Sequence, residues 1–155
     1  MKTNNVYQYP VKKARITYDK SPAHTGRLQF AVDFIIPEGT PIKASFDGIV
    51  VDVKQDSDIG GPDKSFDKFG NYIEIEHPNG EYSIYEHIGK EEALVKKGDR
   101  VKTGQIIGYS GNTGWMAQLG PHLHFDVHKY YEPFGPEDYE TLEIRWKNSR
   151  GRRLR

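Results

Sequence analysis

Apolar and polar residues alternate in short runs along most of this chain, and turn residues separate the runs. Residues 71–77 alternate with Ile73 and Ile75 on one face, and residues 81–88 continue the pattern after Asn79-Gly80, a strong hairpin signal. Further strands are predicted at residues 30–36, 48–53, 105–109 and 122–128, whereas residues 90–94 have a helical pattern.

Several short strands at such close spacing predict an all-β fold. We expect a small antiparallel β-sheet or barrel-sandwich hybrid with an open groove. Two similar segments, 37–44 and 97–104, each place a tight turn before a β-branched residue, as two facing layers of a duplicated hybrid motif would.

The length of 155 residues is sufficient for one domain with a real core. Periodicity is weak in residues 1–23, which we interpret as an N-terminal extension. Residues 24–130 form the predicted domain, in which the polar segment 56–68 is a surface loop. Residues 131–155 are predicted to be an irregular C-terminal segment with a basic tail.

The charge balance is even, with 22 basic and 22 acidic residues, and gives no reason to expect a nucleic-acid partner. The last eleven residues carry six basic and no acidic side chains, a pattern typical of a solvated tail. Cysteine is absent, which excludes disulfides and cysteine-ligated metals. Residues 1–10 lack the apolar region of a signal peptide and no run is long enough to span a membrane, so the sequence leaves the localisation open. We expect a monomer.

The pair His122 and His124 is the strongest chemical signal. On a strand, positions i and i+2 point to the same face, so both imidazoles face one side while Leu123 and Phe125 pack on the other. One surface then holds two groups that can bind a metal or transfer a proton near neutral pH.

A catalytic zinc site needs three protein ligands and an open position. His124 is a candidate, and Asp33 is a second because an ionised carboxylate within the apolar run 30–36 is costly unless it is paired or metal-bound. The alternative is that Asp33 points outward on an alternating strand. His87 lies near the end of a hairpin strand, where it either leans over a groove or is a half-buried surface residue.

Two further histidines have weaker patterns. His77 precedes a turn and is expected to be structural or exposed. His128 shares the parity of His122 and His124 but lies further along the strand, and a surface role is expected for it.

Five segments occur in an order that resembles a known family. They are DFIIPEGTP at 33–41, YEH at 85–87, VKKGDRV at 95–101, GQIIGYSGNTG at 104–114 and HLHF at 122–125. Together they resemble the M23 peptidases, the LytM/lysostaphin-type zinc endopeptidases that cut peptidoglycan cross-bridges. The resemblance extends from about residue 24 to residue 128.

The resemblance implies a fold and a site. The family has a small antiparallel β architecture with a long groove, and its Zn²⁺ is held by an upstream His, an Asp and the second His of the His-x-His pair. Asp33 and His124 match the last two ligands, His122 resembles the general base, and His87 resembles the second catalytic histidine. Tyr85, assigned the strand parity of His87, is expected to line the substrate groove.

The chain departs from the family pattern at the upstream ligand. Gln29 stands four residues before Asp33, where the family has His. The nearest histidine is His24, nine residues before Asp33, and a turn through residues 25–27 would fold it back over the metal. The alternative is that His24 is a loop residue and the zinc site is incomplete.

Three functions therefore remain open. The first is a zinc endopeptidase that hydrolyses peptide cross-bridges or stems of peptidoglycan, at glycine bridges or at D-alanyl cross-links. The second is a degenerate, non-catalytic module that binds cell wall or activates a partner hydrolase. The third is a carrier domain of the biotinyl or lipoyl type, because some short turn segments also resemble those folds. Such a domain has no use for His122 and His124.

Overall fold

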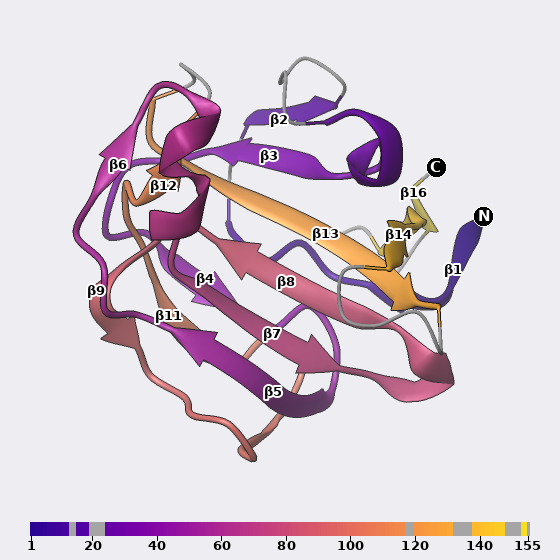
Figure 1. Cartoon of the computed structure of the whole chain (residues 1–155). Helices are drawn as coiled ribbons and strands as arrows, with labels where there is room; N and C mark the ends of the chain where they lie inside the picture. Colours follow the sequence, from indigo (N-terminus) through magenta and orange to yellow (C-terminus); the bar gives the residue numbers. More distant parts are fainter. Residues whose placement is uncertain (13–14, 19–23, 117–119, 132–137, 148–152, 155) are drawn as a thin grey trace.

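The computed structural model describes residues 1–12, 15–18, 24–116, 120–131, 138–147 and 153–154 (Figure 1). Strands dominate this part of the chain, and its helical segments are short 3₁₀ turns, which confirms the all-β prediction. The strands are β1 (Lys2–Tyr7), β2 (Arg15–Tyr18), β3 (Val32–Ile35), β4 (Pro41–Lys43), β5 (Gly48–Lys54), β6 (Gly60–Gly61), β7 (Tyr72–Glu76), β8 (Tyr82–Glu86), β9 (Ile88–Ala93), β10 (Arg100–Val101), β11 (Ile106–Ser110), β12 (Gly114–Trp115), β13 (His122–Tyr130), β14 (Tyr139–Thr141), β15 (Glu143–Lys147) and β16 (Arg153–Leu154). The 3₁₀ turns are η1 (Gly26–Leu28), η2 (Lys64–Phe69) and η3 (Pro78–Gly80).

The central sheet has the strand order β10-β5-β7-β8-β13-β3-β2, with β14 pairing to the far end of β13. The long strand β13 crosses the middle of the molecule between β8 and β3 (Figure 1) and is antiparallel to both. On one face of β13, Leu123, Phe125 and Val127 are fully buried in the apolar core. The opposite face, from His122 onward, is therefore free to hold polar groups.

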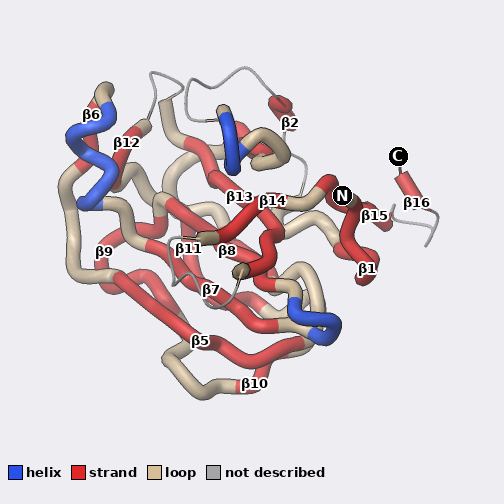
Figure 2. Tube along the Cα trace, turned by 45° about the vertical axis from the view of Figure 1, so that its right-hand side comes forward, coloured by secondary structure: helices blue, strands red, loops and turns tan. Residues whose placement is uncertain are grey.

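The core extends from the central sheet to the small sheet β4-β11-β9 and to the strands near both chain ends. Strand β1 pairs in parallel with β15, and the two lie side by side in Figure 2. Tyr7 from β1 and Trp146 from β15 are fully buried in the same apolar cluster as Phe125. The division of the chain at residues 23 and 131 remains a prediction, but strands from both flanking segments contribute to this core.

Two local predictions were wrong. Residues 90–94, predicted to be helical, lie mostly in β9, which pairs with β11 because sheet hydrogen bonds outweigh a weak helical propensity. The segment after residue 131, predicted to be irregular, contains β14, which pairs with the preceding strand β13, and β15, which pairs with the distant β1. At the hairpin, Asn79 and Gly80 both have φ of 67°, the conformation that this pair was expected to supply. Among the described residues, no helix has the length and apolar character needed to cross a membrane.

Candidate metal centre and groove

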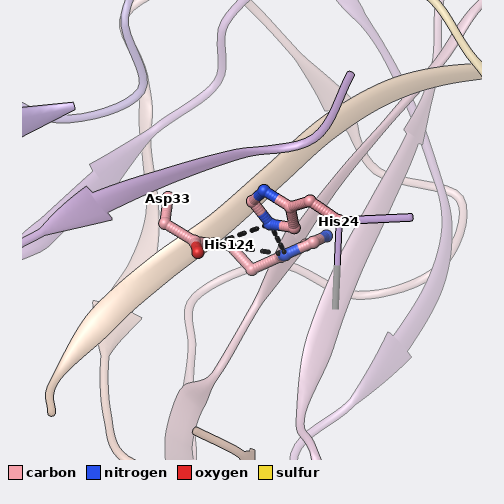
Figure 3. A group of neighbouring side chains, drawn as sticks. All are labelled: His24, Asp33 and His124. Carbon is pink, nitrogen blue, oxygen red and sulfur yellow. Dashed lines mark hydrogen bonds and ion pairs between the residues drawn. The ribbon is translucent and has the colours of Figure 1, made fainter. Parts of the chain in front are cut away.

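Three predicted ligands meet in the structure (Figure 3). Nε2 of His24, Oδ1 of Asp33 and Nδ1 of His124 form a triangle in which each pair of atoms is 3.3 Å apart. All three residues are buried. Such a cluster is unfavourable without a cation because a carboxylate and two imidazoles have been removed from water.

The triangle matches the requirements of Zn²⁺. With bonds of about 2.0–2.1 Å, donors in a tetrahedral zinc site lie about 3.3–3.4 Å apart. Two imidazole nitrogens and one carboxylate oxygen are also the donor types of a catalytic zinc site, which leaves its fourth position open. The donor set and its spacing therefore fit zinc.

Strand pairing explains how Asp33 and His124 meet. The two residues are direct partners in the antiparallel register of β3 and β13, so their side chains project from the same face. Asp33 consequently points into the site, not outward as the alternative interpretation held.

His24 reaches the site from a different direction. It precedes the 3₁₀ turn η1, which returns the chain toward β3, while Gln29 at the end of this turn is exposed. The expectation that a turn through residues 25–27 folds His24 over the metal position agrees with this geometry. Sequence spacing alone does not reveal this arrangement because the turn breaks strand parity.

His122 and His87 flank the three donors. Nε2 of His122 lies 3.8 Å from Oδ1 of Asp33, and the rings of His122 and His87 are 4.5 Å apart. Nδ1 of His122 donates to the carbonyl of Gly120, and Nδ1 of His87 donates to the carbonyl of Thr113, because a carbonyl can only accept. In the neutral form of each ring, Nε2 is therefore an acceptor.

The backbone around His87 is unusual. His87 has φ of 73°, a left-handed conformation that is costly for a residue with a Cβ and that often marks functional sites. Its amide donates to the carbonyl of Asn71, and a Cβ on Gly114 would lie only 2.6 Å from Cα of Gly70. Close packing of these backbone segments holds the carbonyl of Thr113 against the ring of His87.

Electrostatics favour the neutral forms of His87 and His122 beside the ionised carboxylate of Asp33. Burial raises the pKa of Asp33, but hydrogen bonds from His124 and His24 outweigh burial and hold the pKa well below its usual value. Burial, reinforced by His122 and His124, lowers the pKa of His87 to about 3. Burial also lowers the pKa of His122, although Asp33 opposes this effect. At neutral pH both flanking rings are therefore bases and not acids.

A groove of about 670 Å³ runs over this face of the sheet. His87 and His124 line it, and its walls carry aromatic, acidic and basic side chains. The wall residues include Arg27, Lys64, Asp67, Tyr72, Glu86, Trp115, Tyr130 and Tyr139. Lys64 and Asp67 belong to η2, within the segment 56–68 that was predicted to be a surface loop, and Trp115 belongs to β12.

The prediction that Tyr85 lines the groove was wrong. Tyr85 is fully buried, packs on Phe125 with ring centres 5.1 Å apart, and accepts a hydrogen bond from the amide of Ser45. The parity argument failed because β8 ends at Glu86, so His87, with its positive φ, does not follow the alternation of the strand. The groove face of β8 consists of Ile84 and Glu86.

His77 and His128 both make specific contacts. His77 is 4% exposed, with Nδ1 2.7 Å from the carbonyl oxygen of Asp47 and Nε2 2.7 Å from Oγ of Ser83, so it has the structural role expected. The surface role expected for His128 was wrong, because this residue is 2% exposed and lies between Asp126 and Glu74.

Sequence reasoning also missed two carboxylates near the second ring nitrogen of His124. Nε2 of His124 lies 3.3 Å from Oε2 of Glu86 and 3.5 Å from Oδ2 of Asp126. The signal for Asp126 was present, since it continues the same-face row of β13 that begins at His122 and His124. Glu86 gave no comparable signal because it comes from another strand.

The comparisons with known proteins are consistent with this geometry. Residues 27–136 match the sequence family described as Peptidase family M23. The peptidoglycan DD-endopeptidase ShyA of Vibrio cholerae is 42% identical over 127 residues, which cover 77% of this chain and 26% of ShyA. The chain spans about a quarter of the length of the curated relatives it matches.

Solved structures agree with the sequence match. A zinc-containing peptidase from Vibrio cholerae superposes with a TM-score of 0.57 at 37% identity, over 79% of this chain and 36% of that chain. The catalytic domain of lysostaphin from Staphylococcus simulans gives 0.56 at 31% identity, over 83% of this chain and 88% of that domain. Since the family match covers most of the sequence and the same fold recurs in these peptidases, the chain belongs to peptidase family M23, a family of metallopeptidases.

Proposed function

We propose that this chain is a zinc-dependent endopeptidase that hydrolyses peptide bonds of bacterial peptidoglycan. The observation that carries the proposal is the triangle of 3.3 Å contacts among His24, Asp33 and His124. Family membership and the endopeptidase relative ShyA support the reaction type.

His24, Asp33 and His124 would hold the metal. When bound, Zn²⁺ lowers the pKa of its water toward about 7 and polarises the scissile carbonyl. The nearby His122 presents Nε2 without a proton, which suits a general base that removes the proton of the water. The imidazolium so formed can return this proton to the leaving amine.

His87 has a related role in this proposal. Its Nδ1 proton is held by the carbonyl of Thr113, so Nε2 of the neutral ring can accept a proton but cannot donate one. The neutral ring can therefore accept a hydrogen bond from substrate or water at Nε2, and only the protonated form could donate to a developing oxyanion.

For the substrate we propose the D-alanyl cross-link of peptidoglycan and not a glycine bridge. The support is the 42% identity to a DD-endopeptidase, compared with 31% to lysostaphin. The groove walls are also rich in polar and charged side chains such as Lys64, Asp67 and Glu86, which suit a peptide that carries charged groups.

The test combines metal content with turnover. Purified protein should contain one zinc per chain and should release cross-linked fragments from peptidoglycan with D-alanyl cross-links. His122→Ala should retain zinc and lose about 10²–10⁴-fold in rate, whereas the exposed Gln29→Ala should change neither property. A folded protein that binds no zinc, or a His122→Ala variant with full turnover, contradicts the proposal.

The non-catalytic alternative was motivated by Gln29 in place of the usual ligand. The contacts of His24 with Asp33 and His124 support a third donor from elsewhere in the chain, which speaks against this motivation. The same turnover measurement separates the endopeptidase from the non-catalytic module, because a module that only binds peptidoglycan would release no fragments.

A further inference from the structure

The polar face of β13 continues well beyond the candidate ligand His124. Alternate residues along this strand point to the same face, and after His124 these are Asp126, His128 and Tyr130. Asp126 and His128 are each 2% exposed although both are ionisable. Buried polar groups of this kind require partners, and their partners form one connected chain.

The contacts run outward from the metal centre. Nε2 of His124 lies 3.5 Å from Oδ2 of Asp126, and Oδ1 of Asp126 is 2.6 Å from Nδ1 of His128. Nε2 of His128 is 2.8 Å from Oε2 of Glu74, which also accepts the hydroxyl of Tyr130 at 2.5 Å. Each carboxylate in the chain is thus held by a neighbouring donor.

We propose that Asp126 is a positioning residue of the metal centre and that His128 and Glu74 hold it in place. The inference rests on the zinc site of the proposed function. When Nδ1 of His124, which faces Asp33 and His24, binds the metal, the proton of the neutral ring must lie on Nε2. A carboxylate that accepts this proton fixes the tautomer and the ring orientation, and it makes the metal-binding nitrogen a better donor.

Glu86 competes for the same role, since its Oε2 is 3.3 Å from Nε2 of His124. Burial and anchoring distinguish the two carboxylates. The side chain of Glu86 is 34% exposed, so water and substrate also reach it. Asp126 is 2% exposed and already held by His128, so less conformational freedom is lost when it binds His124. This difference favours Asp126.

The first test compares these two carboxylates by zinc affinity, measured through competition with a chromophoric chelator. Asp126→Asn should weaken zinc binding by about 10–100-fold, the range typical for partners of metal-ligating histidines. Glu86→Gln, the matched control, should stay within about threefold of the parent protein. Loss of affinity in Glu86→Gln but not in Asp126→Asn overturns the proposal, and so do equal affinities for all three proteins.

The second test uses the two nitrogens of His128 and does not alter Asp126. The amide nitrogen of Asn replaces Nδ1, which bonds Asp126, whereas the amide nitrogen of Gln replaces Nε2, which bonds Glu74. His128→Asn should therefore bind zinc within about threefold of the parent, and His128→Gln should lose about tenfold. Equal losses in both variants would mean that His128 acts only through packing.

Thermal unfolding of each variant without metal shows whether the fold is intact, and the His128 pair decides the question if Asp126→Asn fails to fold. The two proposals fail separately. A parent protein that binds no zinc contradicts the proposed function. A parent that binds zinc and turns over, with variants of unchanged zinc affinity, contradicts only the role of Asp126.

Discussion

Nδ1 of His124 lies 3.3 Å from Oδ1 of Asp33, and the two residues face each other directly across β3 and β13. The central sheet therefore sets the spacing of two proposed metal donors, and neither depends on a loop. Sites built on paired strands are held more rigidly than sites on loops. The third donor, His24, completes the triangle from outside these strands.

Metal removal should destabilise the folded chain, because the three buried donors then lose the cation that compensates their removal from water. Zinc that binds only the folded chain stabilises it by about 2.7 kcal/mol when its free concentration is 100 times the dissociation constant. We therefore expect a chelator to lower the melting temperature of the parent protein. Asp33→Asn should melt at the same temperature with and without chelator, because the amide is a poor zinc ligand. Differential scanning calorimetry checks this, and a chelator effect that persists in Asp33→Asn would contradict the assignment of Asp33.

The identity of the third ligand is tested by replacing each of the two candidate residues, His24 and Gln29, in turn. His24→Ala should lose stoichiometric zinc, since two donors remain, whereas Gln29→Ala should retain it because the Gln29 side chain is exposed. Zinc per chain after dialysis, measured by atomic emission, gives the answer. Retention of zinc by His24→Ala together with its loss in Gln29→Ala would show that the third ligand lies at position 29, where the family has His, and not at His24.

The N-terminal strand is predicted to depend on one buried carboxylate. Glu81 is fully buried and accepts the amides of Asn4 at 2.5 Å and Asn5 at 3.1 Å and the hydroxyl of Tyr7 at 3.0 Å. Glu81→Gln places an amide group among these donors and should lower the free energy of unfolding by about 1.5–3 kcal/mol. Urea unfolding measures this loss, and the exposed Glu38→Gln serves as the control. Equal stability of both variants would mean that Glu81 does not hold β1.

The pH dependence of stability is predicted from His77. Burial lowers the pKa of His77 from 6.5 to about 4, although the carbonyl of Asp47 opposes this effect. Between these values the unfolded chain binds a proton that the folded chain does not. The contribution of neutral His77 to the free energy of unfolding is therefore fully present above pH 6.5. It is lost as the pH falls toward 4, by about 3 kcal/mol in total.

The measurement is urea unfolding of the parent and of His77→Gln from pH 7 to pH 4, both with chelator so that release of zinc at low pH has no part in the result. The difference in unfolding free energy between the two proteins should shrink as the pH falls, because only the parent carries the unfavourable titration. Curves that stay parallel over this range would show that His77 titrates normally.

Sequence reasoning was most successful where the backbone period decides the outcome. Alternation placed His122 and His124 on one face of a strand and Leu123 and Phe125 on the other, and the structure agrees. It failed at Tyr85, because His87, the residue with which its parity was compared, has a positive φ and lies outside β8. It also failed at residues 90–94, where pairing with β11 overrode a local helical pattern.

The sequence by itself determined the all-β architecture, the family resemblance and most of the reactive side chains, because strand periodicity and short motifs are local properties of the chain. Only the tertiary structure decided that His24 and not Gln29 meets Asp33, and that Asp126, His128 and Glu74 extend behind His124. These contacts join residues far apart in the chain through turns and strand register. Their distances are fixed by the packing of the whole sheet and not by any local pattern.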